Sequence, residues 1–173
     1  MSDPMLVAYA TRYGSTREVA EAIAATLRES GLEVDIQPMR KVQAVASYRA
    51  VVIGAPIYIG SFLKDARRFL SRHSAALATR PVAVFALGPT HGAEQALQSA
   101  RPQLDKELAK FPWLKPVAAE MFGGKYDPAS LRFPDSLLAS LPASPLHGLP
   151  AEDVRNWPAI RAWASDLAAK LRP

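Results

Sequence analysis

The sequence predicts an α/β fold in which a parallel sheet of five strands lies between two layers of helices. Two observations carry this prediction. Short runs that are almost entirely apolar, as strands buried on both faces require, alternate with longer segments whose apolar residues recur at helical spacing. Strands and helices that alternate in this way are joined by right-handed crossovers and form a parallel sheet.

The predicted elements follow one another along the whole chain. Strands are expected at residues 6–10, 34–36, 50–55, 81–87 and 117–122. A helix is expected to begin near Arg17 and to stop at Gly31, and others to cover residues 62–70, 94–110 and 151–171. Pro102 should break or kink the third of these helices. Trp157 and Trp163 share the apolar face of the last helix and are expected in the core.

Composition excludes several classes of protein. The 173 residues include no cysteine, which excludes disulfides, iron–sulfur clusters and thiolate zinc sites, and three scattered histidines do not predict a metal site. No secretory signal or membrane-spanning run is visible, so a cytoplasmic protein is expected, at most peripheral to the inner face of a membrane. The net charge is +5, but the arginines are spread along the sequence without a dense cluster, so nucleic acid is not an expected partner.

The most informative segment is the loop of residues 11–16, between the first strand and the first helix. Its candidate binding residues are Thr11, Arg12, Tyr13, Gly14, Ser15 and Thr16. Backbone N–H groups and the helix dipole favour an anion at such a helix start, and the hydroxyls add donors. The loop lacks the Gly-Lys-Ser/Thr of a P-loop and the Gly-x-Gly-x-x-Gly of a dinucleotide site, so a single terminal phosphate is predicted, as in FMN.

Two further loops should lie beside this one. In a parallel sheet, ligands bind outside the carboxyl ends of the strands, where the strand order reverses. The segments after strands three and four are rich in glycine and proline, and Tyr58 offers an aromatic wall to a flat ring. Their candidate cofactor-binding residues are Pro56, Ile57, Tyr58, Ile59 and Gly60, and then Leu87, Gly88, Pro89, Thr90, His91 and Gly92.

Each candidate also has a structural alternative. Without a ligand, the 11–16 loop would be a hydroxyl-rich helix N-cap. Tyr58 would be a surface aromatic at a strand end, and His91 a solvated loop histidine. For Arg12, contact with phosphate and contact with water are equally expected.

Three motifs in this order resemble the flavodoxin-domain proteins related to quinone-dependent protoporphyrinogen oxidase. They read Thr-Arg-Tyr-Gly-Ser-Thr at residues 11–16, Gly-Ala-Pro-Ile-Tyr-Ile-Gly at 54–60 and Trp-Pro-Ala-Ile-Arg-Ala-Trp-Ala at 157–164, and residues 122–131 also resemble the segment after strand five. The resemblance covers nearly the full chain. It implies a flavodoxin-like three-layer sandwich with strand order 2-1-3-4-5, one domain over residues 1–173, and FMN as the cofactor.

The chain departs from electron-carrying flavodoxins at two points. Those proteins usually place a tyrosine in the strand-four loop and have an acidic surface, whereas this chain has His91 near that position and is basic. In the long connection before the last helix, Leu137, Leu138 and Leu141 share a helical face. In the resembling oxidases a corresponding segment is associated with an apolar substrate or quinone near the membrane. The alternative is an ordinary cover over the sheet.

Two functions remain open. The first is an FMN-dependent oxidoreductase that passes electrons from a porphyrinogen-like or other organic substrate to a quinone, as the resemblance implies; the basic surface and the apolar connection favour it. The second is a non-catalytic electron shuttle with a redox partner protein, favoured because no carboxylate pair, Ser–His–Asp set or cysteine indicates a catalytic residue. A phosphoacceptor receiver is excluded, since no aspartate ends strands one and three. The sequence does not predict the oligomeric state.

Overall fold

The sheet has the predicted architecture. The computed structural model describes residues 2–92 and 94–173. Five parallel strands pair in the order β2-β1-β3-β5-β6, which is the predicted order 2-1-3-4-5 counted by parallel strands alone, so the fold prediction is confirmed. The strands are β1 (Met5–Tyr9), β2 (Val34–Pro38), β3 (Ala50–Tyr58), β5 (Val82–Leu87) and β6 (Ala118–Phe122).

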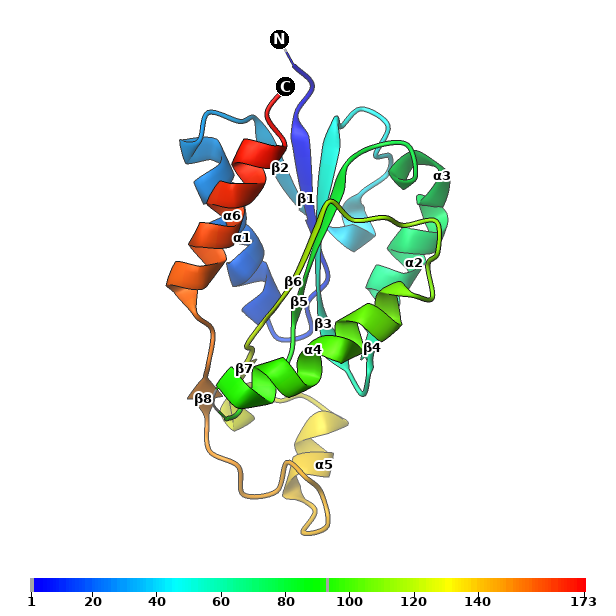
Figure 1. Cartoon of the computed structure of the whole chain (residues 1–173). Coiled ribbons are helices and arrows are strands. Elements are labelled where there is room, and N and C mark those ends of the chain that lie inside the picture. The colour runs from blue at the N-terminus through cyan, green and yellow to red at the C-terminus, as the bar shows by residue number, and fades with distance from the viewer. Residues whose placement is uncertain (1, 93) are drawn as a thin grey trace.

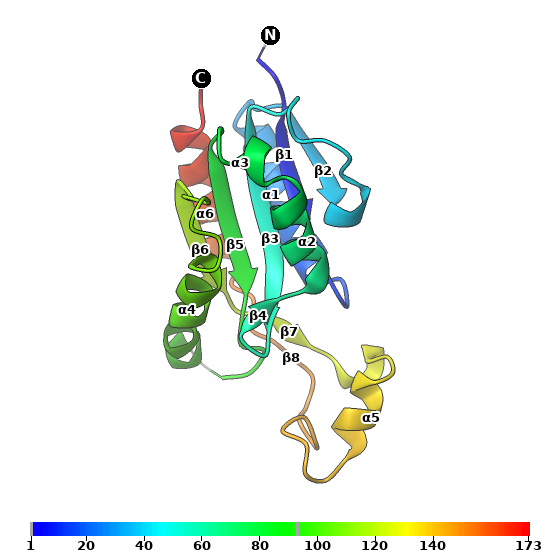
Figure 2. The same cartoon turned by 90° about the vertical axis from the view of Figure 1, so that its right-hand side faces the viewer.

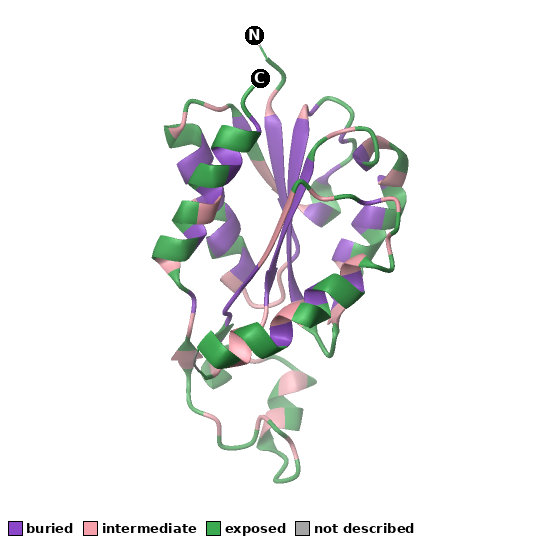
Figure 3. Ribbon diagram, viewed as in Figure 1, coloured by how far each residue is buried: buried purple, intermediate pink, exposed green. Residues whose placement is uncertain are grey.

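Helices cover both faces of the sheet (Figure 1). The helices α1 (Ser15–Glu29) and α6 (Trp157–Lys170) lie on one face, and α2 (Lys64–Arg72), α3 (Ser74–Leu77) and α4 (Glu94–Leu108) on the other. Each layer buries its own apolar cluster against alternate residues of the strands. The strands are therefore apolar on both sides, and exposed residues gather on the outer faces of the helices (Figure 3).

The predicted tryptophans lie against the core. Trp163 packs edge-on against Phe85 and Phe122, with ring centroids 6.2 and 5.9 Å away. Trp157 is half-buried against the same apolar cluster. Both core assignments are confirmed.

Several short elements lie at or beyond the carboxyl ends of the strands. The chain between β6 and α6 carries β7 (Lys125–Tyr126), a 3-10 turn η2 (Pro128–Ser130), α5 (Asp135–Ser140) and β8 (Glu152–Asp153). The strands β7 and β8 pair antiparallel and so bring the two ends of this segment together; we call the segment the 125–153 connection. It extends away from the sheet at the end where the parallel strands finish (Figure 2).

The segment after strand three is a hairpin. Residues Pro56, Ile57 and Tyr58, predicted in a loop, extend β3, and β4 (Ser61–Phe62) pairs antiparallel with the last two of them. The turn between the two strands is Ile59–Gly60, with φ of 50° and 75°. A positive φ is costly for a β-branched residue, so the ladder bonds on both sides must hold Ile59 in this conformation. The second helix consequently begins at Lys64, because Phe62 is committed to the hairpin.

The predicted start of the last helix was wrong, and so was the alternative that Pro102 breaks the third one. The last helix begins at Trp157, because Asn156 caps it by accepting the N–H of Ala159 and because the residues before it pair in β8. The Asn156 cap with Pro158 in the first turn is a start signal that could have been read from the sequence. The helix α4 runs unbroken through Pro102, whose exposed position leaves the freed carbonyl of the exposed Gln98 facing water.

Candidate functional site

The 11–16 loop connects the end of β1 to the first turn of α1. Gly14 is the N-cap of α1 and has a φ of 92°, a left-handed conformation that a side chain would strain. Its N–H donates to the hydroxyl of Thr11 at 2.9 Å, which closes the turn. Because glycine has no side chain, no side-chain cap bond is made to the first turn of α1. The N–H groups of that turn are therefore available to bind an anion.

The hydroxyl of Thr16 supports the same interpretation. Thr16 is fully buried, and its Oγ1 has no hydrogen-bond partner among the described residues. A buried hydroxyl without a partner costs free energy, so such a group indicates either strain or a missing acceptor. A phosphate oxygen at the helix start would supply that acceptor. The residues present thus fit one phosphate group.

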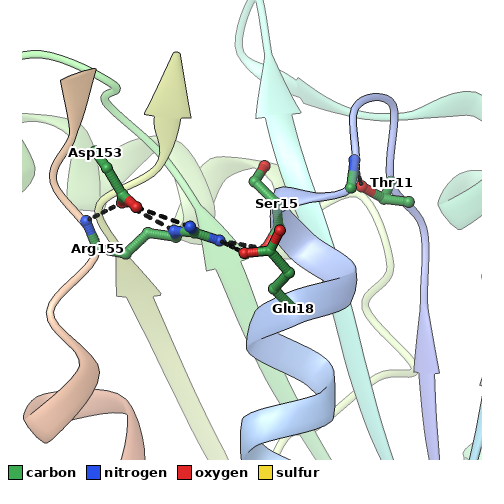
Figure 4. A network of polar contacts seen from close by, with 6 residues as sticks. Thr11, Ser15, Glu18, Asp153 and Arg155 are labelled. Atoms are coloured by element: carbon green, nitrogen blue, oxygen red, sulfur yellow. Dashed lines mark hydrogen bonds and ion pairs between the residues drawn. The ribbon is translucent and has the colours of Figure 1, made fainter. Parts of the chain in front are cut away.

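An arginine far along the chain holds the first turn of α1 from the outside (Figure 4). The Arg155 guanidinium donates to the backbone oxygen of Ser15 at 3.2 Å and to the Glu18 carboxylate at 2.8 Å. It also donates to both oxygens of Asp153 at 2.9 and 2.8 Å and lies 4.7 Å from the ring centroid of Trp157. The hydrogen bonds between Arg155 and Asp153 raise the pKa of the arginine and lower that of the aspartate.

Arg155 also neutralises a carboxylate near the proposed anion site. Glu18 lies in the first turn of α1, where its charge would repel a phosphate bound at the same helix end. The side chain of Arg155 is 3% exposed and is ion-paired to Glu18, so this repulsion is offset. The sequence analysis missed this residue, and no local pattern marks an arginine 140 positions from its loop partner.

Tyr58 stands at the end of β3 beside the 11–16 loop. Its side chain is 40% exposed, which leaves ring surface available to a ligand. Burial of the hydroxyl raises the pKa of Tyr58, and the Arg12 guanidinium, 5.7 Å from the ring centroid, opposes that shift. The buried carboxylate of Glu107 accepts the N–H of Phe62 at 3.0 Å and so fixes the hairpin that carries Tyr58. Glu107 was also missed in the sequence.

The segment after β5 packs against its neighbours more than it faces open space. The N–H of Gly88 donates to Phe122 at 2.8 Å, and Pro89 accepts from Gly124 at 2.8 Å. A Cβ on Gly88 would approach the terminal methyl of Met121 to 2.6 Å, so the flexible Met121 side chain would have to shift to admit one. Leu87 is buried, and Thr90 reaches the candidate cavity.

His91 is engaged with the 125–153 connection. Its Nδ1 lies 2.9 Å from the hydroxyl of Thr90, and its Nε2 lies 2.9 Å from the carbonyl oxygen of Pro150. Its ring also lies 5.1 Å from that of Tyr126. These contacts give His91 a role in fixing the connection, and its predicted role toward a ligand remains a prediction.

The 125–153 connection also meets the 11–16 loop directly. Asp135 on α5 accepts a hydrogen bond from the Tyr13 hydroxyl and pairs with Arg12, at 2.8 Å from Nε. Arg132 donates to the backbone oxygen of Arg12 at 2.6 Å. The apolar residues of the same segment remain exposed, with Phe133 at 79% and Leu137 at 52%. Polar contacts, and not apolar packing, hold α5 against the loop.

A cavity of about 150 Å³ lies where the loop, the hairpin and the connection converge. The predicted residues that line it are Tyr13, Ser15, Tyr58 and Thr90, and the connection adds Lys125, Tyr126 and Asp135, among others. The other predicted residues of the 11–16 loop are not among those that line the cavity; they are Thr11, Arg12, Gly14 and Thr16. Pro56, Ile57 and Leu87 form strand ends beside it, whereas Ile59 and Gly60 lie at the exposed hairpin tip and Gly92 is exposed. In the described ranges, no cluster of metal-ligating side chains comes together.

One expectation about charge was wrong. The sequence suggested basic residues spread without a dense cluster, but Arg40, Lys64, Arg67, Arg68 and Arg72 line one groove on the α2 side of the molecule. They are distant in sequence from the 11–16 loop, and helical spacing along α2 brings four of them together. None of the helices within residues 2–92 and 94–173 is long and apolar enough to cross a membrane.

Comparisons with known proteins agree with this architecture. A family model described as "Flavodoxin domain" matches residues 6–141. Over 84 residues the chain is 31% identical to protoporphyrinogen IX dehydrogenase [quinone] of Escherichia coli, and the match spans 47% of this chain and 46% of that protein. The matched segment is therefore about half the length of this curated relative.

Solved structures resemble the whole chain at low sequence identity. A flavodoxin from the domain Archaea aligns with a TM-score of 0.55 at 15% identity over 96% of this chain and 97% of its own. A Streptococcus pneumoniae flavodoxin gives 0.57 at 17% identity over 96% and 99%. A flavodiiron core from Synechocystis gives 0.61 at 16% identity over 97% of this chain and 36% of its own. At these identities the likeness shows the fold alone.

Proposed function

Because the chain belongs to the flavodoxin domain family, we propose that it binds FMN and works as an FMN-dependent oxidoreductase. The observation that carries the proposal is the first turn of α1. There Gly14 leaves the helix start uncapped by a side chain, and the buried hydroxyl of Thr16 has no partner among the residues that the structure describes. Both features suit the single phosphate of FMN. The whole chain of residues 1–173 is proposed to form one domain around this site.

The proposed assignments divide the cofactor between three segments. Thr11, Ser15 and Thr16, with the N–H groups of the first turn of α1, would hold the phosphate. Tyr58 would lie against the flavin ring, and the segment at Gly88–Thr90 would border it. Arg155 would position the loop and keep Glu18 from repelling the phosphate.

The cavity between these segments implies that the 125–153 connection moves. Its volume of about 150 Å³ is below the roughly 300 Å³ at which drug-sized ligand pockets begin. Asp135 and Leu131 of the connection form part of its wall. We therefore expect the connection to shift outward when FMN enters, while the 11–16 loop stays in place.

For the reaction, we propose an organic substrate of the porphyrinogen type as the electron donor and a quinone as the acceptor. When bound, FMN would supply the redox chemistry by taking an electron pair from the first and giving it to the second. The support is the similarity to the Escherichia coli dehydrogenase, together with the exposed apolar residues of α5 beside the site. The protein would bind the substrate and shield the ring, and no catalytic side chain is assigned.

A non-catalytic electron shuttle is the second candidate, and one observation favours it. Every carboxylate that lines the cavity already has a partner: Glu18 pairs with Arg155, Asp135 with Arg12, and Asp127 accepts the N–H of Ala129. Within the part of the chain that the structure describes, no carboxylate without a partner thus lines the cavity to serve as an acid or base, although Lys125 also lines it. An electron shuttle needs no catalytic carboxylate.

Two measurements test the proposal in order. Purified protein should be yellow and should release FMN, not FAD, on denaturation; a protein that cannot be reconstituted with either flavin contradicts the cofactor assignment. The FMN-loaded protein is then mixed with protoporphyrinogen and menaquinone, and porphyrin fluorescence is followed. Quinone-dependent fluorescence supports the oxidoreductase. Flavin that exchanges electrons with a chemical reductant but gives no porphyrin supports the shuttle.

A further inference from the structure

A second concave surface lies away from the candidate cofactor site. It is a groove between α2 and the 3-10 turn η1 (Met39–Lys41), which pack beside each other, and it has a volume of about 1060 Å³. Figure 2 shows α2 facing the viewer on this side of the molecule. The charged residues that line the groove are Arg40, Lys64, Asp65, Arg67, Arg68 and Arg72.

This groove holds most of the net charge of the protein. Five cationic side chains face one carboxylate, which gives the lining a net charge of +4, while the whole chain has +5. The rest of the chain is therefore nearly balanced. His73, which also lines the groove, adds no charge near neutral pH because burial, and then the neighbouring Arg72, lower its pKa.

The pattern differs from that of an ordinary solvated helix face. The exposed faces of α1 and α4 carry ion pairs at i,i+4, Arg17–Glu21 and Arg101–Asp105, each at 2.8 Å. On α2 the same spacing brings like charges together, in Lys64–Arg68 and Arg68–Arg72. Like charges at this spacing destabilise a helix, and Lys64 also opposes the dipole at its N-terminus.

The charges of this face are largely unpaired. Among the described residues, Lys64, Arg67, Arg68 and Arg72 have no carboxylate within 4.0 Å, and Arg40 approaches Asp65 only at 3.6 Å. A ligand with several acceptors would relieve the repulsion among these cations and accept hydrogen bonds from the arginine and lysine side chains.

We propose that the groove docks an acidic segment of a partner protein. Charge complementarity identifies the partner, since a row of carboxylates would match cations that stand on both walls, Arg40 from η1 and the others from α2. A flat bilayer cannot enter a concave groove. A single nucleic acid strand would need exposed aromatic rings for stacking, and the one aromatic ring of the lining besides His73, Phe69, is buried.

The groove lies next to the 11–16 loop, although it is separate from the cofactor cavity. A small cavity of about 30 Å³ is lined by Met39, Arg40 and Asp65 from the groove side and by Tyr9 and Thr11 from the loop side. A partner held in the groove would therefore sit beside the first residue of the loop. The docking itself does not depend on the flavin assignment.

The test compares two variants of equal charge. One replaces Arg67, Arg68 and Arg72 by glutamine; the matched control replaces Arg161, Lys170 and Arg172, which are exposed at the α6 side of the fold. The full chain is titrated against a fluorescein-labelled poly-glutamate peptide, and anisotropy is measured at low and at raised salt. We expect the groove variant to lose about tenfold or more in affinity and the control about twofold or less, with binding by the parent weakened by salt.

Each other outcome overturns the proposal. Equal losses in the two variants would show that the peptide responds only to net charge. Tighter, groove-dependent binding of a DNA duplex, or of vesicles of phosphatidylcholine with phosphatidylglycerol, would assign the groove to nucleic acid or to a membrane. Circular dichroism and the melting temperature verify that both variants fold. If the triple groove variant does not fold, the single Arg68→Gln variant replaces it.

Discussion

The 11–16 loop and the 125–153 connection face each other across the candidate site, but different forces hold them. The loop is fixed by its position between a buried strand and a helix, by a left-handed glycine and by the nearly buried Arg155. The connection is held near the loop by a few partly exposed polar contacts through Asp135 and Arg132. The comparison indicates one firmly held half and one loosely held half, which in the proposed function would recognise the cofactor and cover it.

The largest expected effect is on the rigid side, in a double variant with Ser15→Ala and Thr16→Val. In the proposed site each change would remove a hydrogen bond to a charged phosphate, so FMN binding should weaken by about 3 kcal/mol or more, roughly a hundredfold. Riboflavin has no phosphate, and its affinity should change little. Fluorescence quenching titrations with both flavins measure the two affinities.

The single Thr16→Val variant adds a control, because its effect on the stability of the flavin-free protein should not be a loss. Because the hydroxyl has no partner within residues 2–92 and 94–173, its removal should leave the melting temperature of the flavin-free protein unchanged or raise it. Equal losses of FMN and riboflavin in the double variant would show that the loop does not hold the phosphate. A large drop in stability would show that the hydroxyl has a structural partner.

The next largest effect is expected for Arg155→Met, which removes the side chain that contacts Ser15 and Glu18 in the first turn of α1. The change leaves Glu18 and Asp153 without their common partner and should destabilise the fold by about 1–3 kcal/mol, a value reduced by the exposure of both carboxylates. FMN affinity should also fall several-fold, since Glu18 then repels the phosphate. Urea denaturation and flavin titration measure the two effects.

A second substitution separates these two roles of Arg155. Glu18→Gln in the Arg155→Met background should restore FMN affinity but not stability, because it removes the repulsion and not the lost hydrogen bonds. If affinity stays low in the double variant, Arg155 acts on the geometry of the loop and not on its charge.

A smaller effect is expected where the hairpin meets the site, in Tyr58→Ala. Lost stacking and burial should weaken FMN and riboflavin alike, by about 1 kcal/mol or somewhat more, roughly fivefold. Water would reach the ring and stabilise the anionic reduced form, so the reduction potential of bound FMN should rise. Potentiometric titration checks this, with Tyr58→Phe as the control that keeps the ring. An unchanged potential in Tyr58→Ala would place Tyr58 away from the flavin.

The difference between the two regions also explains what the sequence could predict. The alternation of strands and helices and the 11–16 loop depend on local patterns: apolar runs, helix starts and a turn glycine. The strand order was expected only from the resemblance to flavodoxin-domain proteins. The contacts of Arg155 with Ser15 and of Asp135 with Arg12 join positions more than a hundred residues apart, and no local pattern encodes such a pair. The pairing of β7 with β8 involves two residues in each strand, which is too few to show the alternating pattern by which a strand is recognised in a sequence.

The same reasoning applies to the basic groove. Along the sequence, Arg40 and the residues of α2 are separated, and the linear spread suggested an evenly decorated surface. A helical projection of residues 64–72 would have shown the like-charged spacing. The pairing of η1 with α2, which completes the groove, follows only from the tertiary fold.

The smallest effect is expected on the movable side, in Asp135→Asn. The change weakens the contacts of α5 with Arg12 and Tyr13, which are partly exposed, so the stability of the fold should fall by less than about 1 kcal/mol. Hydrogen exchange of residues 131–141 should nevertheless speed up, because few apolar contacts hold this segment in place. Since the connection narrows the cavity, FMN should associate faster while its affinity changes little. Stopped-flow flavin binding measures the rate, and the conservative Asp135→Glu variant should keep the parent rate. If exchange and association are both unchanged in Asp135→Asn, the connection is held by other contacts and does not act as a cover.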